Sequence, residues 1–163
     1  MEYKIIVAVE NKEDRDLIVS YIQNHYQNSI ILTTRDQDEI FEKTQNQELD
    51  LLIIEKLRNH KHTVEFINEL KSNEKTNEIP LIYISDSNEK ENVLKVLEAG
   101  ANTFLMKPLN EKDLEKTISG MLLSVVIKNE KQLEAKIKNG EIFDFEKIIE
   151  KTRQQFIVEK EAS

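Results

Sequence analysis

The sequence is poor in the residues that build several common kinds of site. It has no cysteine, which excludes disulfides and thiolate zinc sites. It has only three glycines, and none follows the first apolar run, where the chain reads Glu-Asn-Lys-Glu. A nucleotide-binding α/β enzyme would need a glycine-rich phosphate loop at that point. The composition therefore disfavours an enzyme or nucleotide binder of that kind.

Basic clusters and long apolar runs are also missing. The formal net charge is −8, and lysine and glutamate alternate along most of the chain. Because phosphate binding relies on clustered Lys and Arg, this pattern argues against a nucleic-acid partner or an anionic membrane. No apolar run approaches the length of a membrane span, and the start of the chain lacks the features of a signal peptide. We therefore expect a soluble, cytoplasmic protein.

The most informative stretch is the run Leu-Leu-Ile-Ile at positions 51–54. Four consecutive aliphatic residues predict a strand that is buried on both faces, as in the middle of a parallel sheet flanked by helices. Shorter or similar runs predict four more strands, at residues 4–9, 29–33, 79–84 and 103–106.

Apolar residues at three- and four-residue spacing predict a helix after each of the first four strands. These helices cover residues 11–27, 34–47, 63–70 and 88–99, with Asn11 and Thr63 as N-caps and Gly100 as a C-terminal cap. Strands that alternate with helices predict a doubly wound α/β domain. Right-handed crossovers then bring Glu10, Glu55, Ser85 and Lys107 to one edge of the sheet, because each follows a strand.

The last third of the chain departs from this alternation. Residues 110–139 have helical character, Gly140 interrupts it, and residues 143–159 predict a final helix. The segment 121–127 is apolar almost all round, so a helix with one exposed face does not account for it. We expect Met121, Leu122, Val125 and Val126 to form an interface, covered by the final helix, a second copy of the chain, or both.

Three motifs give the chain a family resemblance. They are Asp50-Leu-Leu-Ile-Ile-Glu55, Ile79-Pro-Leu-Ile-Tyr-Ile-Ser85 and Ala99-Gly-Ala-Asn-Thr-Phe-Leu-Met-Lys-Pro108. With these motifs in this order, residues 1–125 resemble a response-regulator receiver domain. The resemblance implies a flavodoxin-like, doubly wound sheet of five parallel strands, and a cis bond before Pro108. Residues 126–163 would then be a C-terminal α-helical extension.

The resemblance also assigns roles to individual residues, and some of them depart from the family pattern. The family's acidic pair, which holds Mg²⁺, corresponds to Val9 and Glu10, and its phospho-accepting aspartate corresponds to Glu55. The hydroxyl, aromatic and lysine residues of its switch correspond to Ser85, Phe104 and Lys107.

These departures predict an atypical member of the family. Val9 removes one oxygen ligand of Mg²⁺, and Glu10 and Glu55 place theirs one methylene further out. We therefore predict no cofactor and no metal site, with Glu10 and Glu55 as the only residual candidates. The predicted function is a phosphorylation-independent pseudo-receiver, a signalling module rather than an enzyme. It would act by protein contact or dimerisation through its fourth helix, fifth strand and fifth helix, with a coiled-coil extension.

Other interpretations stay open at this point. The chain is alternatively a divergent but competent receiver that accepts phosphate from a histidine kinase. Lys107 is alternatively a structural salt link with no switch attached, and Phe104 a plain core residue. The sequence His60-Lys-His62 is typical of a flexible polar loop more than of a metal site.

Overall fold

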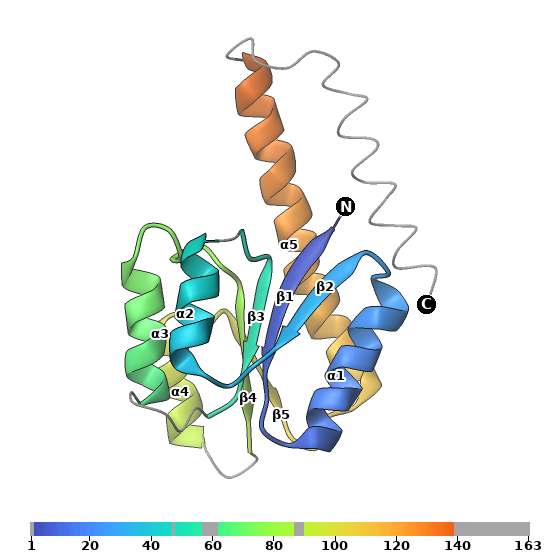
Figure 1. The fold of residues 1–163 in the computed structure, drawn as a ribbon, viewed down its shortest axis with the longest axis vertical. Coiled ribbons are helices and arrows are strands. Elements are labelled where there is room, and N and C mark those ends of the chain that lie inside the picture. The colour runs from blue at the N-terminus through green and yellow to red at the C-terminus, as the bar shows by residue number, and fades with distance from the viewer. Residues whose placement is uncertain (1, 47, 57–61, 87–89, 139–163) are drawn as a thin grey trace.

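A computed structural model describes residues 2–46, 48–56, 62–86 and 90–138. Five parallel strands form one sheet in the order β2-β1-β3-β4-β5, which confirms the predicted flavodoxin-like fold (Figure 1). The strands are β1 (Tyr3–Ala8), β2 (Ser29–Thr33), β3 (Leu51–Ile54), β4 (Leu81–Ser85) and β5 (Thr103–Met106). The helices are α1 (Lys12–His25), α2 (Gln37–Asn46), α3 (Thr63–Ser72), α4 (Lys90–Ala99) and α5 (Glu111–Lys138).

The helices cover both faces of the sheet. Helices α1 and α5 lie on one face, and α2, α3 and α4 lie on the other (Figure 1). Leu51 and Ile53 belong to the apolar cluster under α1 and α5, while Leu52 and Ile54 belong to the cluster on the opposite face. The prediction that residues 51–54 are buried on both faces is therefore confirmed. Because apolar clusters cover both of its faces, β3 is aliphatic throughout, and the first polar residue after it is Glu55.

The caps of the first and third helices show one success and one error. The Asn11 side chain accepts a hydrogen bond from Asp14 N at 2.9 Å, so Asn11 caps α1 as predicted. The predicted cap of α3 is wrong by one residue. Thr63 is already helical and buried, and His62 is the N-cap, with Nδ1 accepting from Val64 N at 3.4 Å. Burial of Thr63 turns its side chain into the protein, so the preceding residue takes the capping position.

Gly100 ends α4 in the left-handed region of backbone conformation, with φ +126°. Its N–H donates to Leu97 O at 3.1 Å, and Ala101 N–H donates to Val96 O at 3.0 Å. These two bonds satisfy the last carbonyls of the helix. A Cβ at this position would lie 2.5 Å from Lys71 Cγ, so glycine is required both by conformation and by space.

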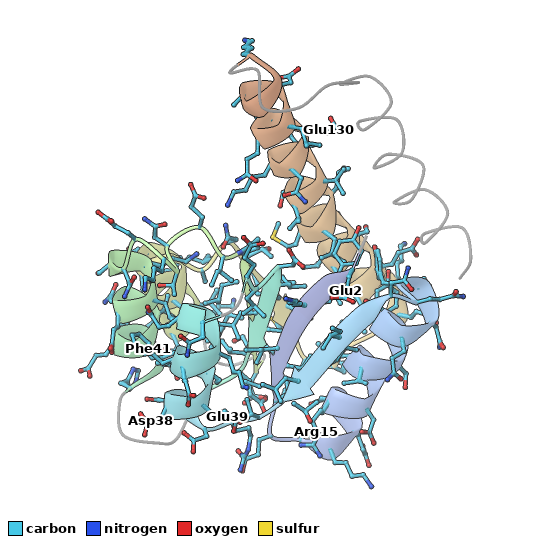
Figure 2. All side chains as sticks on the ribbon, turned by 45° about the horizontal axis from the view of Figure 1, so that its top comes forward. Glu2, Arg15, Asp38, Glu39, Phe41 and Glu130 are labelled. Carbon is cyan, nitrogen blue, oxygen red and sulfur yellow. The ribbon has the colours of Figure 1, made fainter. Side chains whose placement is uncertain are left out.

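Helix α5 is much longer than the others and extends beyond the sheet (Figure 1). Its first turns pack on the sheet through Leu114, Ile118, Leu122 and Val126, at four-residue spacing. Glu130 lies on the part that projects past the sheet (Figure 2). The proposed boundary between residues 125 and 126 falls inside this helix. The predicted final helix, 143–159, lies outside the described residues.

The residues expected to form an interface are mostly inside the chain. Leu122, Val125 and Val126 are buried, and Met121 packs against the same apolar cluster. The apolar side chains that this part of α5 leaves exposed are instead Leu123 and Ile127, at 43 % and 45 %. Hydrophobic residues all round a helix do not reveal which side faces the sheet. Among the helices of the described residues, none is long and apolar enough to cross a membrane.

Asp50, just before β3, allows a test of how the sheet tolerates a partly buried charge. Its Oδ2 accepts a hydrogen bond from Lys4 N at 2.9 Å, and burial raises the pKa of its carboxyl. A raised carboxyl pKa means that the contribution of this group to stability is lost as pH rises through the raised value. Replacing Asp50 with asparagine keeps an acceptor for Lys4 N and removes the charge.

We expect Asp50→Asn to leave the free energy of unfolding at pH 7 unchanged or higher than in the parent. Asp50→Leu, in contrast, leaves Lys4 N without this acceptor, and we expect a loss of about 1–2 kcal/mol. Urea denaturation at pH 7 measures both. A clear loss in Asp50→Asn would mean that the charge itself stabilises the start of β3.

Candidate functional site

The carboxyl ends of the strands meet at one edge of the sheet, and Glu55 lies at its centre. Glu55 directly follows β3 and is only 8 % exposed. Its backbone N–H donates to Ala8 O at 3.1 Å, which continues the pairing of β3 with β1 past the end of the strand. The backbone thus holds Glu55 beside the loop that leads into α1.

Both oxygens of the Glu55 carboxylate have partners. Oε1 accepts hydrogen bonds from the backbone N–H groups of Glu10 and Asn11, the second at 3.3 Å. Oε2 lies 2.8 Å from Lys107 Nζ. The amides belong to the loop before α1, where the positive end of the helix dipole also favours an anion. The carboxylate is therefore anchored from both sides and does not project into solvent.

The Lys107 side chain, just after β5, lies near three carboxylates, which come from α1 and from the ends of β3 and β4. Besides Glu55, its Nζ lies 3.3 Å from Asp14 Oδ2 and 3.9 Å from Asp86 Oδ1. Burial lowers the pKa of Lys107, but the hydrogen bonds and charges of Glu55 and Asp14 outweigh it and raise the pKa above its ordinary value. Asp14 was missed as a site residue because its place in the first turn of α1 is explained by the helix dipole alone.

Lys107 is also tied to β4 through its backbone. Lys107 N–H donates to Ser85 O at 2.8 Å, and the peptide bond between Lys107 and Pro108 is cis. The Ser85 side chain is fully buried, and its hydroxyl donates to Asp86 O at 3.0 Å. The structure therefore places Ser85 at the same edge as Glu55, with its hydroxyl engaged in its own loop. Phe104 lies in β5 beside Tyr83 and is 37 % exposed.

The two positions that correspond to the acidic pair serve different purposes. The Val9 side chain is fully buried in the cluster under α1 and α5. The Glu10 carboxylate forms an ion pair with Arg35, at 3.0 Å between Oε1 and Nη1. Arg15 Nη1 donates to the carbonyl oxygens of Val9 and Glu10, at 3.2 and 3.3 Å. Arg15 lies at the same end of the molecule as Asp38 and Glu39 of α2 (Figure 2).

Neither arginine was predicted as part of the site. Both lie outside the family motifs, and only the packing of α1 and the β2–α2 loop brings them to this edge. Arg35 pairs with the Glu10 carboxylate, and Arg15 binds the backbone carbonyls of Val9 and Glu10, while the Glu10 N–H stays bonded to Glu55.

The side chains at this edge do not fit a bound Mg²⁺ ion. Mg²⁺ requires oxygen ligands in near-octahedral geometry at short distance. Val9 supplies no side-chain oxygen, Glu10 is paired with Arg35, and Glu55 Oε2 is paired with the Lys107 ammonium group. Across the part of the chain that the structure describes, no group of three or more His, Asp or Glu side chains could hold a metal ion.

Comparison with known proteins gives the family. The response regulator receiver domain family matches residues 5–119. The chain belongs to this family. Receiver domains are generally signalling modules of two-component systems rather than enzymes.

Individual relatives are distant. The phosphate regulon transcriptional regulatory protein PhoB of Escherichia coli (strain K12) is 24 % identical over 123 residues, which are 75 % of this chain and 52 % of PhoB. The chain thus spans about half the length of PhoB. The structure of NtrX from Brucella abortus aligns with a TM-score of 0.70 and 20 % identity, over 83 % of this chain and 31 % of NtrX. The chemotaxis response regulator CheY4 of Vibrio cholerae aligns with a TM-score of 0.65 and 20 % identity, over 75 % of this chain and 100 % of CheY4. At these identities the two structures share the fold.

Proposed function

We propose that this chain is a pseudo-receiver, an atypical receiver module that signals without being phosphorylated. The observation that supports this proposal most strongly is the Glu55–Lys107 ion pair, with Nζ 2.8 Å from Oε2 and the other carboxylate oxygen bound by two backbone amides. A carboxylate held in this way already occupies the place where the family carries its acyl phosphate.

Phosphoryl transfer depends on positioning and on cations that neutralise the charge on the transferred group. Val9 contributes no ligand for such a cation, and Arg35 engages the Glu10 carboxylate. Glutamate also extends the acceptor carboxylate outward by about one C–C bond, roughly 1.5 Å. A phosphoryl donor would therefore meet neither the metal nor the acceptor geometry that the reaction needs.

The proposed output is protein–protein contact through the face formed by α4, β5 and α5. Leu94 of α4 is 62 % exposed, and Phe104 and Met106 of β5 are 37 % exposed each. Exposed apolar residues grouped on one face are typical of an interaction surface. We propose a partner protein or a second copy of the chain for this face, with residues 1–125 as the receiver and residues 126–163 as its helical extension. We propose no nucleic-acid or membrane partner.

The second candidate is a divergent receiver that still accepts phosphate from a histidine kinase. It is favoured by Lys107 and Ser85, which are the residue types that the family uses and which lie at the expected edge. The two candidates differ in one measurable property, the capacity of the protein to be phosphorylated.

We expect no gain of a phosphoryl group when the protein is incubated with acetyl phosphate and Mg²⁺, as measured by intact mass. CheY4 of Vibrio cholerae, treated in parallel, serves as a comparison receiver, and the Val9→Asp/Glu55→Asp double variant restores the acidic residues of the family. Labelling of that variant, with none of the parent, would attribute the loss to these two positions. Stoichiometric labelling of the parent at Glu55 would instead establish the second candidate.

A further inference from the structure

Strand β2 is an open edge of the sheet, because among the described strands it pairs only with β1. Thr34 N–H, just past the strand, donates to Val7 O at 3.3 Å. Successive residues of a strand direct their backbone groups to opposite sides, so the even-numbered residues of β2 bond to β1. The backbone N–H and C=O groups of Ser29, Ile31 and Thr33 therefore point away from the sheet.

The face of β2 on the side of α2 is also uncovered. Ile30 is 53 % exposed, whereas Ile6 of β1, which lies beside Leu32, is 2 % exposed. A hollow of about 430 Å³ lies there, with Ile6, Ile30, Leu32 and Leu49 among its lining residues. Figure 1 shows α2 displaced toward β3 and α3, so none of the described helices covers this end of β2.

The sequence of β2 itself carries none of the usual protection against pairing. Natural edge strands are commonly blocked by a charged residue, a proline or a bulge. The sequence Ser-Ile-Ile-Leu-Thr of β2 contains no charged residue and no proline, and its pairing with β1 runs without interruption from Ser29 to Thr33. An apolar strand with free backbone groups is a template for another strand.

We propose that β2 pairs with β2 of a second copy of the chain, antiparallel and related by a two-fold axis at Ile31. In this arrangement Ile31 lies opposite its own equivalent, and Ser29 lies opposite Thr33 of the second copy. The outward backbone groups of these three residues then exchange up to about six N–H···O bonds. Two five-stranded sheets become one continuous sheet.

The second copy is favoured over another partner because the strand is complementary to itself. Read in either direction, β2 has a hydroxyl residue, three aliphatic residues and a hydroxyl residue. The two-fold arrangement sets Ser29 against Thr33 and Ile30 against Leu32, and both kinds of cross-strand pair are favourable. The Ile30–Leu32 pairs also cover the hollow beside β2. The strand itself adds no charge to the contact, and the hollow beside it is lined by both signs of charge, from Glu2, Lys4 and Lys43.

The contact is separate from the α4–β5–α5 face, because β2 and β5 are opposite edges of the sheet. Strand pairing of this length buries less surface than a standard stable interface, so we expect weak association. The test therefore needs a wide concentration range, from about 10 µM to 1 mM.

The experiment compares the full-length protein with Ile30→Lys and with Leu94→Lys, which tests the α4–β5–α5 face as the alternative contact between copies. Both residues are exposed and apolar, at 53 % and 62 %, and lie on opposite edges of the molecule. Light scattering across the concentration range gives the molar mass, and amide hydrogen exchange reports pairing at Ser29, Ile31 and Thr33. We expect a concentration-dependent dimer, at least about tenfold weaker association in Ile30→Lys, and slowed exchange at Ser29, Ile31 and Thr33 that is retained in Leu94→Lys.

Hydrogen exchange shows whether a dimer forms through β2 or through another surface. Exchange at Ser29, Ile31 and Thr33 that slows as the dimer forms supports strand pairing. A monomer at every concentration, a dimer disrupted by Leu94→Lys alone, or unchanged exchange at these three amides overturns it. The outcome is independent of acetyl phosphate labelling, so failure of this proposal and failure of the pseudo-receiver proposal are distinguishable.

Discussion

Replacing Lys107 with methionine is expected to lower the free energy of unfolding by about 3 kcal/mol. The substitution leaves the Glu55 carboxylate, whose side chain is 10 % exposed, without its cationic partner. It also removes the partner of Asp14 at 3.3 Å. Breaking a buried ion pair from one side typically costs about 3–5 kcal/mol. The lower end applies here because the Lys107 side chain is 24 % exposed. Urea denaturation at pH 7 measures the loss.

A double-mutant cycle separates the ion pair from other effects of the substitution. Glu55→Gln keeps an oxygen that can accept from the amides of Glu10 and Asn11, and removes the charge that faces Lys107. If the pair is the cause, adding Lys107→Met to Glu55→Gln will cost much less than Lys107→Met alone. Equal costs in the two backgrounds would show that Lys107 acts through packing or through Asp14.

The pH dependence of this difference follows from the raised pKa of Lys107. A lysine whose pKa is higher in the folded state contributes stability that is fully present below its ordinary pKa of 10.5 and is lost as pH rises through the folded value. The difference in stability between the parent and Lys107→Met should therefore be constant near neutral pH and shrink only above pH 10.5.

Replacing Leu122 with alanine is expected to cost about 3 kcal/mol of the free energy of unfolding. Leu122 is fully buried in the cluster that also contains Ile118 and Val126 of α5. Leucine-to-alanine changes at such sites remove apolar contacts and leave a cavity, at a cost of about 2–5 kcal/mol. Urea denaturation followed by circular dichroism measures the loss.

Leu123 provides a matched control in the next position of the same helix. It is 43 % exposed, so we expect Leu123→Ala to cost about 0.5 kcal/mol or less. Similar losses for the two variants would contradict the orientation of α5 on the sheet. Because Leu122 and Val126 are buried in the core, a truncation after Ser119 would remove core contacts as well as the exposed side chains of α5.

Much of the fold could be predicted from the sequence because its signals are local. The aliphatic run at 51–54 can be accommodated only where both faces of a strand are covered, and this made β3 the centre of a parallel sheet. Right-handed crossovers then determine that the residue after each strand lies at one edge. The proximity of Glu55 and Lys107, 52 residues apart, follows from that rule and from their positions at strand ends.

The other side-chain contacts at this edge of the sheet could not be predicted in the same way. Asp14 reaches Lys107 because α1 packs on the sheet in one particular rotation, and Arg35 reaches Glu10 through the loop after β2. The side-chain direction of Ser85 likewise depends on the path of the loop after β4, where its hydroxyl bonds to Asp86 O. Such contacts depend on rotamers and helix rotation, which sequence spacing does not encode.

Helix α5 shows within one segment what the sequence determined and what only the tertiary structure decided. The apolar sequence at 121–127 by itself determined that this part of the helix would be covered. Only the tertiary structure decided which side is covered, with Leu122 and Val126 against the sheet and Leu123 and Ile127 exposed. The physical reason is that the sequence of a helix reveals its buried side only when polar residues mark the opposite side. Where almost every position is apolar, the rotation of the helix is set by how its side chains fill the space above the strands.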